Sequence, residues 1–261
     1  DTYVSGRTLN FSGFDAITGG DDDDVIDVNS SRALAVAGGA GMDTITLSAH
    51  VILTGAVSGG DDDDVITLED NASVAGGNNV SGNAGNDTVI LGFQSSISGQ
   101  AIGGAGTDSL QYNKVGTNAT VTLTQLNATP ADGFDGTASG VTGGFASFSD
   151  FRGSASTMDA LVTAIPANAV WTLNTLSNTY ANIAGGTAIF AGFDSVTGDA
   201  TAADQFVLAT GATGAGGVTS LALDGGVSGG ANTLTGNDSV NAFTIDGPDS
   251  GTLQIGALSA T

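Results

Sequence analysis

Apolar and polar residues alternate in short segments that recur along the first half of the chain. In each segment an aspartate is followed by a large apolar residue two positions later and by another four positions later. The paired apolar positions are Ile26 and Val28, Ile45 and Leu47, Ile66 and Leu68, Val89 and Leu91, and Leu110 and Tyr112. Alternation with a period of two predicts a strand with one buried face.

A second apolar position lies upstream of these segments, two residues before a glycine. It is occupied by Ile17, Val36, Val57 and Val80. Each repeat is therefore expected to form two or three short strands separated by Gly, Asn and Ser turns. A helical period of 3.6 residues does not compete with this pattern.

The spacing of the repeat defines one coil. The aspartates that precede the strands are Asp24, Asp43, Asp64, Asp87 and Asp108, and they are separated by 19, 21, 23 and 21 residues. Equivalent strands one coil apart can stack in parallel, with their apolar residues in an internal column. The sequence predicts an all-β parallel β-helix or β-roll solenoid with about 20 residues per coil.

The repeat divides the chain into three expected parts. Residues 1–112 carry the clear repeats, residues 113–147 lack them and predict an irregular insertion or loop-rich coils, and residues 148–261 predict degenerate coils. Phe190 and Phe193 repeat the spacing of Phe11 and Phe14, so the chain is expected to continue into a further repeat. These aromatic pairs, and Trp171, are predicted to fill the core.

The composition indicates that the folded chain needs either bound cations or dispersal of its charge. Its 261 residues include 42 glycines, 27 acidic residues, 4 basic residues and no cysteine, for a net charge of −23. Clustered carboxylates repel one another unless cations bind them. Scarcity of Lys and Arg excludes nucleic acid and anionic membrane surfaces as partners. No apolar run approaches the ~20 residues of a membrane helix, so membrane insertion is not expected.

The coils share the motif Gly-Gly-x-Gly-x-Asp-x-U-x, where U is a large aliphatic residue. Its glycines permit a tight turn that exposes carbonyl oxygens, and its aspartate adds a carboxylate. Calcium binds six to eight such hard oxygens. Between Gly19 and Tyr112 the sequence resembles the RTX (repeats-in-toxin) family of secreted bacterial proteins and, more loosely, large repetitive adhesins and surface-layer proteins. The resemblance implies a right-handed β-roll, calcium between successive turns, and folding after export.

The resemblance also implies which residues bind calcium. The metal-facing carboxylates would be Asp24, Asp43, Asp64, Asp87 and Asp108, with Asp22 and Asp62 standing where the family often has glycine. Backbone carbonyls would come from Gly19, Gly38, Gly41, Gly59, Gly82, Gly85, Gly103 and Gly106. Asp159 and Asp204 follow their glycines with one extra residue and are further candidates. Because each coil has one motif, calcium is expected along a single edge. Alternatively, these aspartates cap turns without metal.

Catalysis is not expected. His50 is the sole histidine and Glu69 the sole glutamate, and the chain has no cysteine nucleophile and no phosphate-binding loop. We expect an extracellular, calcium-stabilised structural protein of the bacterial cell surface, such as a filament, surface-layer or adhesin-stalk subunit. Its partners would be other copies of itself, end to end or laterally, and surface glycans.

Two alternatives remain open. One is an adhesin module that binds sugar or ice, for which Thr44, Thr46, Thr67 and Thr88 are suggestive although they do not recur at one fixed coil position. The other is a β-helix enzyme that acts on polysaccharides, because acidic pairs abound.

Overall fold

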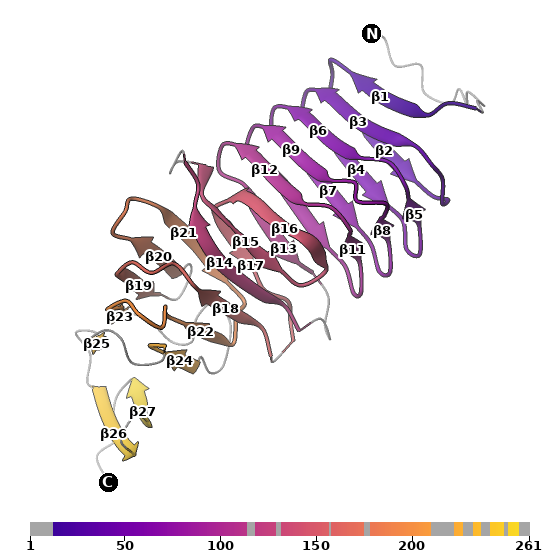
Figure 1. The fold of residues 1–261 in the computed structure, drawn as a ribbon. Helices are drawn as coiled ribbons and strands as arrows, with labels where there is room; N and C mark the ends of the chain where they lie inside the picture. The colour runs from indigo at the N-terminus through magenta and orange to yellow at the C-terminus, as the bar shows by residue number, and fades with distance from the viewer. Residues whose placement is uncertain are drawn as a thin grey trace.

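A computed structural model gives the fold of the chain (Figure 1). It describes residues 13–113, 118–128, 132–156, 158–174, 178–209, 222–226, 232–235, 241–247 and 250–255. These residues contain no α-helix, and hence no helix that could cross a membrane. The remaining parts of the three expected segments, including Phe11, lie outside the described residues.

Most strands belong to two long sheets. Sheet A contains, in spatial order, β1 (Ala16–Gly20), β3 (Ala35–Ala40), β6 (Val57–Asp61), β9 (Val80–Ala84), β12 (Ala101–Ala105), β16 (Val141–Phe148), β15 (Phe134–Ala138), β14 (Thr120–Leu126), β18 (Ala160–Thr163), β22 (Ser195–Thr197) and β24 (Ala222–Asp224). Its short additional strands are β5 (Ile52–Leu53), β8 (Ser73–Val74) and β11 (Ser96–Ile97).

Sheet B contains β2 (Val25–Val28), β4 (Thr44–Leu47), β7 (Val65–Leu68), β10 (Thr88–Leu91), β13 (Ser109–Tyr112), β17 (Asp150–Arg152), β21 (Thr187–Ala191), β20 (Asn178–Asn182), β19 (Ala169–Leu173), β23 (Gln205–Leu208) and β25 (Thr233–Thr235). A separate antiparallel pair is formed by β26 (Asn241–Gly247) and β27 (Ser250–Ile255).

In the first half the chain passes from sheet A to sheet B and back once per repeat. Each strand pairs in parallel with its equivalent in the next repeat, as Val36 pairs with Val57 and Val57 with Val80. Figure 1 shows β1, β3, β6, β9 and β12 as a series of parallel rungs. The prediction of an all-β fold with stacked parallel strands is confirmed, and this arrangement is compatible with a β-solenoid.

The alternating apolar residues form the internal columns that the sequence predicted. Ile45, Ile66, Val89 and Leu110 occupy one level of sheet B and are fully buried. Burial of each such side chain stabilises the fold by about 1.5–3 kcal/mol. A column of this kind fixes the register, because a slip of one residue would turn every apolar side chain outward.

Antiparallel strands interrupt the parallel stacking in each sheet. In sheet A, β15 runs antiparallel to both β14 and β16, and the turn between β15 and β16 contains Gly140 with φ +80°. In sheet B, β20 runs antiparallel to both β19 and β21. The sequence predicted only irregular or degenerate coils in these regions, because an antiparallel pairing made once leaves no repeat to recognise.

Aromatic side chains fill the core around the second interruption. Trp171 is fully buried, and its ring centroid lies 4.7 Å from that of Tyr180 and 5.7 Å from that of Phe206, on which it stacks. Phe190 and Phe193 are also buried. The predicted core role of Trp171 and of this aromatic pair is confirmed, whereas Phe14 is 61% exposed.

Candidate metal centre

An aspartate directly precedes each sheet-B strand of the regular coils, and its carboxylate connects neighbouring coils. Oδ1 of Asp43 accepts the backbone N–H of Asp24 at 2.8 Å, and Oδ1 of Asp64 accepts that of Asp43 at 2.8 Å. The same bond joins Asp87 to Asp64 at 2.9 Å and Asp108 to Asp87 at 2.8 Å. We call Asp24, Asp43, Asp64, Asp87 and Asp108 the aspartate ladder.

The second carboxylate oxygen of four of the five ladder aspartates lacks a hydrogen-bond partner. Oδ2 of Asp43, Asp64, Asp87 and Asp108 is buried and accepts no hydrogen bond. These four residues are at most 1% exposed. An ionised carboxylate oxygen removed from water carries a large desolvation cost unless a cation or a donor compensates it. The ladder therefore contains a row of uncompensated anionic atoms.

The first glycine of each motif makes room for this oxygen. A Cβ placed on Gly38 would lie 2.0 Å from Oδ2 of Asp43, and one placed on Gly82 would lie 2.1 Å from Oδ2 of Asp87. Any side chain there would collide with the carboxylate, so glycine is required by the packing. Equivalent close approaches occur at Gly19, Gly59 and Gly103.

Burial changes the ionisation of the ladder. Desolvation raises the pKa of the Asp64, Asp87 and Asp108 carboxyls from the ordinary value of 3.8 to about 6, and nearby carboxylates add to this rise. The backbone hydrogen bond that each accepts opposes the rise only in part. Desolvation also raises the pKa of Asp43. A bound cation would favour the ionised form by removing this penalty.

The other predicted aspartates lie on the exposed side of the turns. Asp22 and Asp62 are exposed, and Oδ2 of Asp62 accepts the N–H of Gly41 at 3.3 Å. Asp62 has φ +74° and thus adopts the left-handed conformation of Gly41 and Gly85, which stand at the third-glycine position of the neighbouring motifs. Asp62 thus shares the backbone conformation of that glycine position, whereas Asp22 does not have a positive φ, and the carboxylate of Asp62 lies outside the buried row.

A second set of polar side chains ties the turns together in the opposite direction. Oδ1 of Asp23 accepts the N–H of Met42 at 2.8 Å, and Oδ1 of Asp63 accepts the N–H of Asn86 at 2.6 Å. The acceptor here belongs to the earlier coil, whereas the aspartate ladder uses the later one. The sequence analysis did not predict this role, although both acceptors stand directly before a ladder aspartate.

Asp159 and Asp204 are not equivalent to each other. Asp204 lies where the chain passes from sheet A to sheet B, as the ladder aspartates do, whereas Asp159 lies where it passes from sheet B to sheet A. The backbone N–H of Asp159 donates to Asp194, and Phe151 pairs with Phe190. Asp159 therefore corresponds to Asp194 and not to Asp204, although the same six-residue spacing follows the glycine in both cases, and only Asp204 keeps the position of the ladder aspartates.

The turns offer calcium a mixed set of oxygens. In the part of the chain that the structure describes, no three His, Cys, Asp or Glu side chains converge on one metal site. Ligands besides the ladder carboxylates would therefore be backbone carbonyls, such as the oxygen of Gly38, which lies 2.6 Å from the position of a Cβ on Gly19. Calcium accepts such mixed carbonyl and carboxylate coordination. The unpartnered carboxylate oxygens and the neighbouring carbonyls are donors of the type that such a cation requires.

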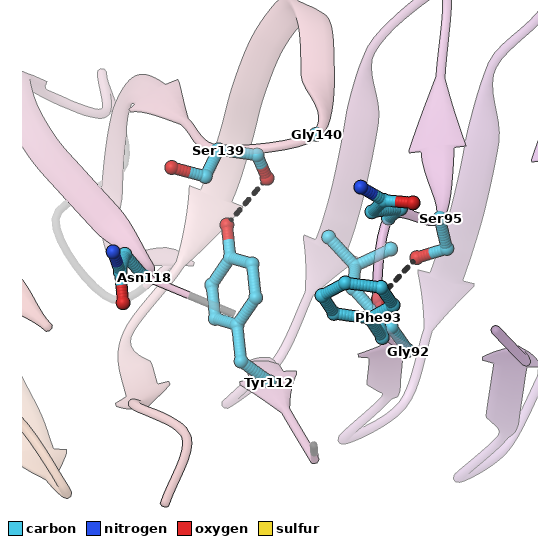
Figure 2. Close-up of a pocket in the computed structure, with 9 residues that line it drawn as sticks. Gly92, Phe93, Ser95, Tyr112, Asn118, Ser139 and Gly140 are labelled. Carbon is cyan, nitrogen blue, oxygen red and sulfur yellow. Dashed lines mark hydrogen bonds between the residues drawn. The ribbon is translucent and has the colours of Figure 1, made fainter. Parts of the chain in front are cut away.

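A small pocket lies at the junction of the regular coils and the antiparallel strands (Figure 2). Its volume is about 260 Å³, and Leu91, Phe93, Tyr112 and Asn118 are among its lining residues. The hydroxyl of Tyr112 donates to the carbonyl of Ser139 at 2.7 Å, as the dashed line in Figure 2 shows. No sequence motif marked this pocket, because it depends on where the insertion folds back.

The outward threonines of sheet B lie in two adjacent columns. Thr44 and Thr88 share one column with Val65 between them, and Thr46 and Thr67 share the other, which continues to Ile90. Aliphatic residues thus interrupt both columns. A surface that binds ice requires a regular array, so the register does not favour this alternative.

Comparisons with protein-family models, with curated proteins and with solved structures find no match for this chain.

Proposed function

We propose that this chain is a calcium-stabilised structural element of a bacterial cell surface, built as a right-handed β-solenoid. The observation that carries the proposal is the row of buried, unpartnered Oδ2 atoms along the aspartate ladder. Calcium between successive turns would neutralise these carboxylates and join each coil to the next. A net charge of −23 likewise favours the binding of cations by the chain as a whole.

The chemistry of the turn favours calcium over magnesium. Magnesium requires near-ideal octahedral geometry and retains its waters, whereas calcium accepts six to eight oxygens in irregular arrangements that include backbone carbonyls. Extracellular modules bind calcium at about 10⁻⁴ to 10⁻³ M, which matches the expected extracellular location. The family resemblance between Gly19 and Tyr112 supports the same choice.

A mechanical task agrees with the form of the molecule. Stacked parallel strands make a rod whose stability is approximately a sum over neighbouring coils. Within the described residues, β1 and β2 pair with a strand on one side only. Unpaired strand edges are templates for another chain. We therefore propose end-to-end assembly with further copies, and no catalytic role.

Calcium titration of the purified full chain tests the function. Calorimetric titration should show several binding equivalents, and the melting temperature in excess calcium should exceed that in chelator. Saturation at 100 times the dissociation constant stabilises the fold by about 2.7 kcal/mol per site. Magnesium at the same concentration is the control. Identical melting curves in calcium, magnesium and chelator would contradict the proposal.

Sedimentation and electron microscopy at saturating calcium test the assembly. We expect rods longer than one chain, which shorten or disperse when chelator is added. A monodisperse monomer at saturating calcium would instead support an isolated adhesin module.

A further inference from the structure

The turn that leads to a buried aspartate has two lengths in this chain. In the regular coils the aspartate follows the first glycine by five residues, as Asp87 follows Gly82. Asp204 follows Gly198 by six residues. A Cβ on Gly82 or Gly198 would lie 2.1 or 2.2 Å from Oδ2 of the respective aspartate. The extra residue therefore lengthens the turn but keeps the carboxylate against the glycine.

The longer turn supplies the carboxylate with hydrogen-bond donors. Oδ2 of Asp204 accepts the backbone N–H of Asp199 at 2.9 Å. Oδ2 of Asp159, which also follows its glycine by six residues, accepts the N–H and the hydroxyl of Ser154 at 2.7 and 2.8 Å. In both turns the donor is the residue directly after the glycine. In both turns the chain itself thus supplies hydrogen bonds to Oδ2, although desolvation still raises the pKa of the Asp204 carboxyl.

The shorter turn has no such donor available. There the residue after the first glycine remains in a strand of sheet A, where Gly39 pairs with Gly60 and Gly60 with Asn83. The coils approach so closely at this level that a Cβ on Gly60 would lie 1.8 Å from the carbonyl oxygen of Gly39. A residue held in this ladder cannot turn its N–H toward the carboxylate, so Oδ2 stays without a partner.

An asparagine takes the place of the aspartate at the ladder position that follows Asp204. Oδ1 of Asn232 accepts the N–H of Asp204 at 2.7 Å, so Asn232 occupies the next ladder position. Its Nδ2 donates to the carbonyl of Gly225 at 2.7 Å. The amide nitrogen thus takes the place of Oδ2 and brings its own protons. An uncharged side chain can hold this position without a cation.

We propose that the extra turn residue replaces the cation, so that the chain divides into a cation-dependent segment at Asp43 to Asp108 and a cation-independent segment from Asp159 to Asn232. This division rests on the calcium binding proposed above. A buried carboxylate oxygen requires either a positive charge or donors, and only the longer turns supply the donors. Withdrawal of calcium then loosens the first segment while the second remains folded, so calcium sets the rigid length of the rod.

Hydrogen–deuterium exchange of the full chain, with and without chelator, tests this division directly. Peptides between residues 36 and 112 should exchange about tenfold faster in chelator, because local opening is governed by local stability. Peptides between residues 158 and 209 should exchange at an unchanged rate. An equal acceleration in both segments overturns the division while leaving calcium binding intact. No acceleration in either segment overturns the proposed calcium function itself.

Two matched substitutions provide a second test with a different readout. Asp87 and Asp204 both lie where the chain passes from sheet A to sheet B. Asp87→Asn should remove one calcium equivalent in calorimetric titration and reduce the calcium-induced rise in melting temperature. Asp204→Asn should leave the number of calcium equivalents unchanged and lower the melting temperature equally in calcium and in chelator. Loss of a calcium equivalent in Asp204→Asn overturns the proposal.

Discussion

At the scale of single residues, the four buried ladder aspartates, Asp43 to Asp108, place their two oxygens in different environments. Oδ1 of Asp64 holds the preceding coil through the N–H of Asp43, whereas Oδ2 lies beside Gly59 without a donor. One side chain therefore stabilises the stack through its first oxygen and opposes it through its second. The balance between these effects depends on whether a proton or a cation reaches Oδ2.

A substitution at the first glycine should be costly for steric reasons. A Cβ on Gly59 would lie 2.2 Å from Oδ2 of Asp64, so we expect Gly59→Ala to destabilise the fold by about 3 kcal/mol. Gly77 is the control, because nothing lies within 4 Å of its Cβ position and only its φ of +78° opposes alanine. Gly77→Ala should cost about 1 kcal/mol. Urea denaturation in calcium measures both, and equal costs would contradict the collision.

The raised pKa values predict how stability changes with pH in metal-free buffer. The folded-state pKa of Asp64, Asp87 and Asp108 is about 6, above the ordinary value of 3.8. The folded chain thus binds protons more tightly, and this stabilisation is complete below pH 3.8 and is lost as the pH rises through 6. Melting temperatures should therefore fall between about pH 4 and pH 6.

Calcium should weaken or reverse this dependence, because metal and protons compete for the same carboxylates. Circular dichroism melts in metal-depleted and in calcium-saturated buffer measure the difference. A melting temperature that rises with pH in metal-depleted buffer would show that the ladder aspartates do not account for most of the pH dependence of stability.

At the scale of elements, two kinds of strand pairing share the same sheets. The regular coils stack in parallel because each contributes the same apolar residues at the same level, as with Ile45 and Ile66. The insertions pair antiparallel to their neighbours and pack bulky aromatic residues inside. Strand β19 then pairs in parallel with β23, so the parallel stack resumes beyond the insertion.

The buried tryptophan should be the main anchor of the second insertion. We expect Trp171→Ala to cost about 3–5 kcal/mol, because it removes a fully buried ring in contact with Tyr180 and Phe206. Val170 on the same strand is 37% exposed, and Val170→Ala should cost less than about 1 kcal/mol. Chemical denaturation followed by circular dichroism compares the two. Equal costs would mean that the aromatic cluster adds little to stability.

At the scale of the whole molecule, the chain carries a large excess of negative charge. The chain carries 27 acidic and 4 basic residues, and the ion pair of Arg152 with Asp150, at 2.7 Å, neutralises only one carboxylate. Exposed carboxylates at the turn tips repel one another over distances comparable to the Debye length, about 10 Å at 0.1 M salt. The folded chain is therefore expected to depend on its ionic surroundings as a whole.

Monovalent salt should partly substitute for calcium. Without divalent cations, raising NaCl from about 20 mM to about 500 mM should raise the melting temperature by screening the acidic turns. The same change in saturating calcium should have a smaller effect if, as proposed, bound calcium neutralises the ladder. Scanning calorimetry measures both series. A melting temperature that does not respond to salt in chelator would contradict a dominant role for charge repulsion.

The sequence by itself determined the strands, their parallel stacking and the position of the turns in the first half. It could do so because the Asp-x-U-x-U pattern repeats, and a repeated pattern defines both the buried face and the partner of each strand. The same repetition placed Asp43 and Gly38 in one turn. The antiparallel pairing of strands such as β15 and β20 could not be predicted in this way, since each pairing occurs once and depends on contacts between distant residues.

Only the tertiary structure decided what surrounds each carboxylate oxygen. From sequence, Asp87 and Asp204 differ by one residue in the preceding turn. In the fold that residue determines whether a backbone N–H reaches Oδ2, as Asp199 does for Asp204. The environment of an atom depends on the direction of groups brought close by folding, and a linear spacing does not record direction. The repeat thus predicts where the acidic turns stack, and the three-dimensional packing decides in which of them a donor reaches Oδ2.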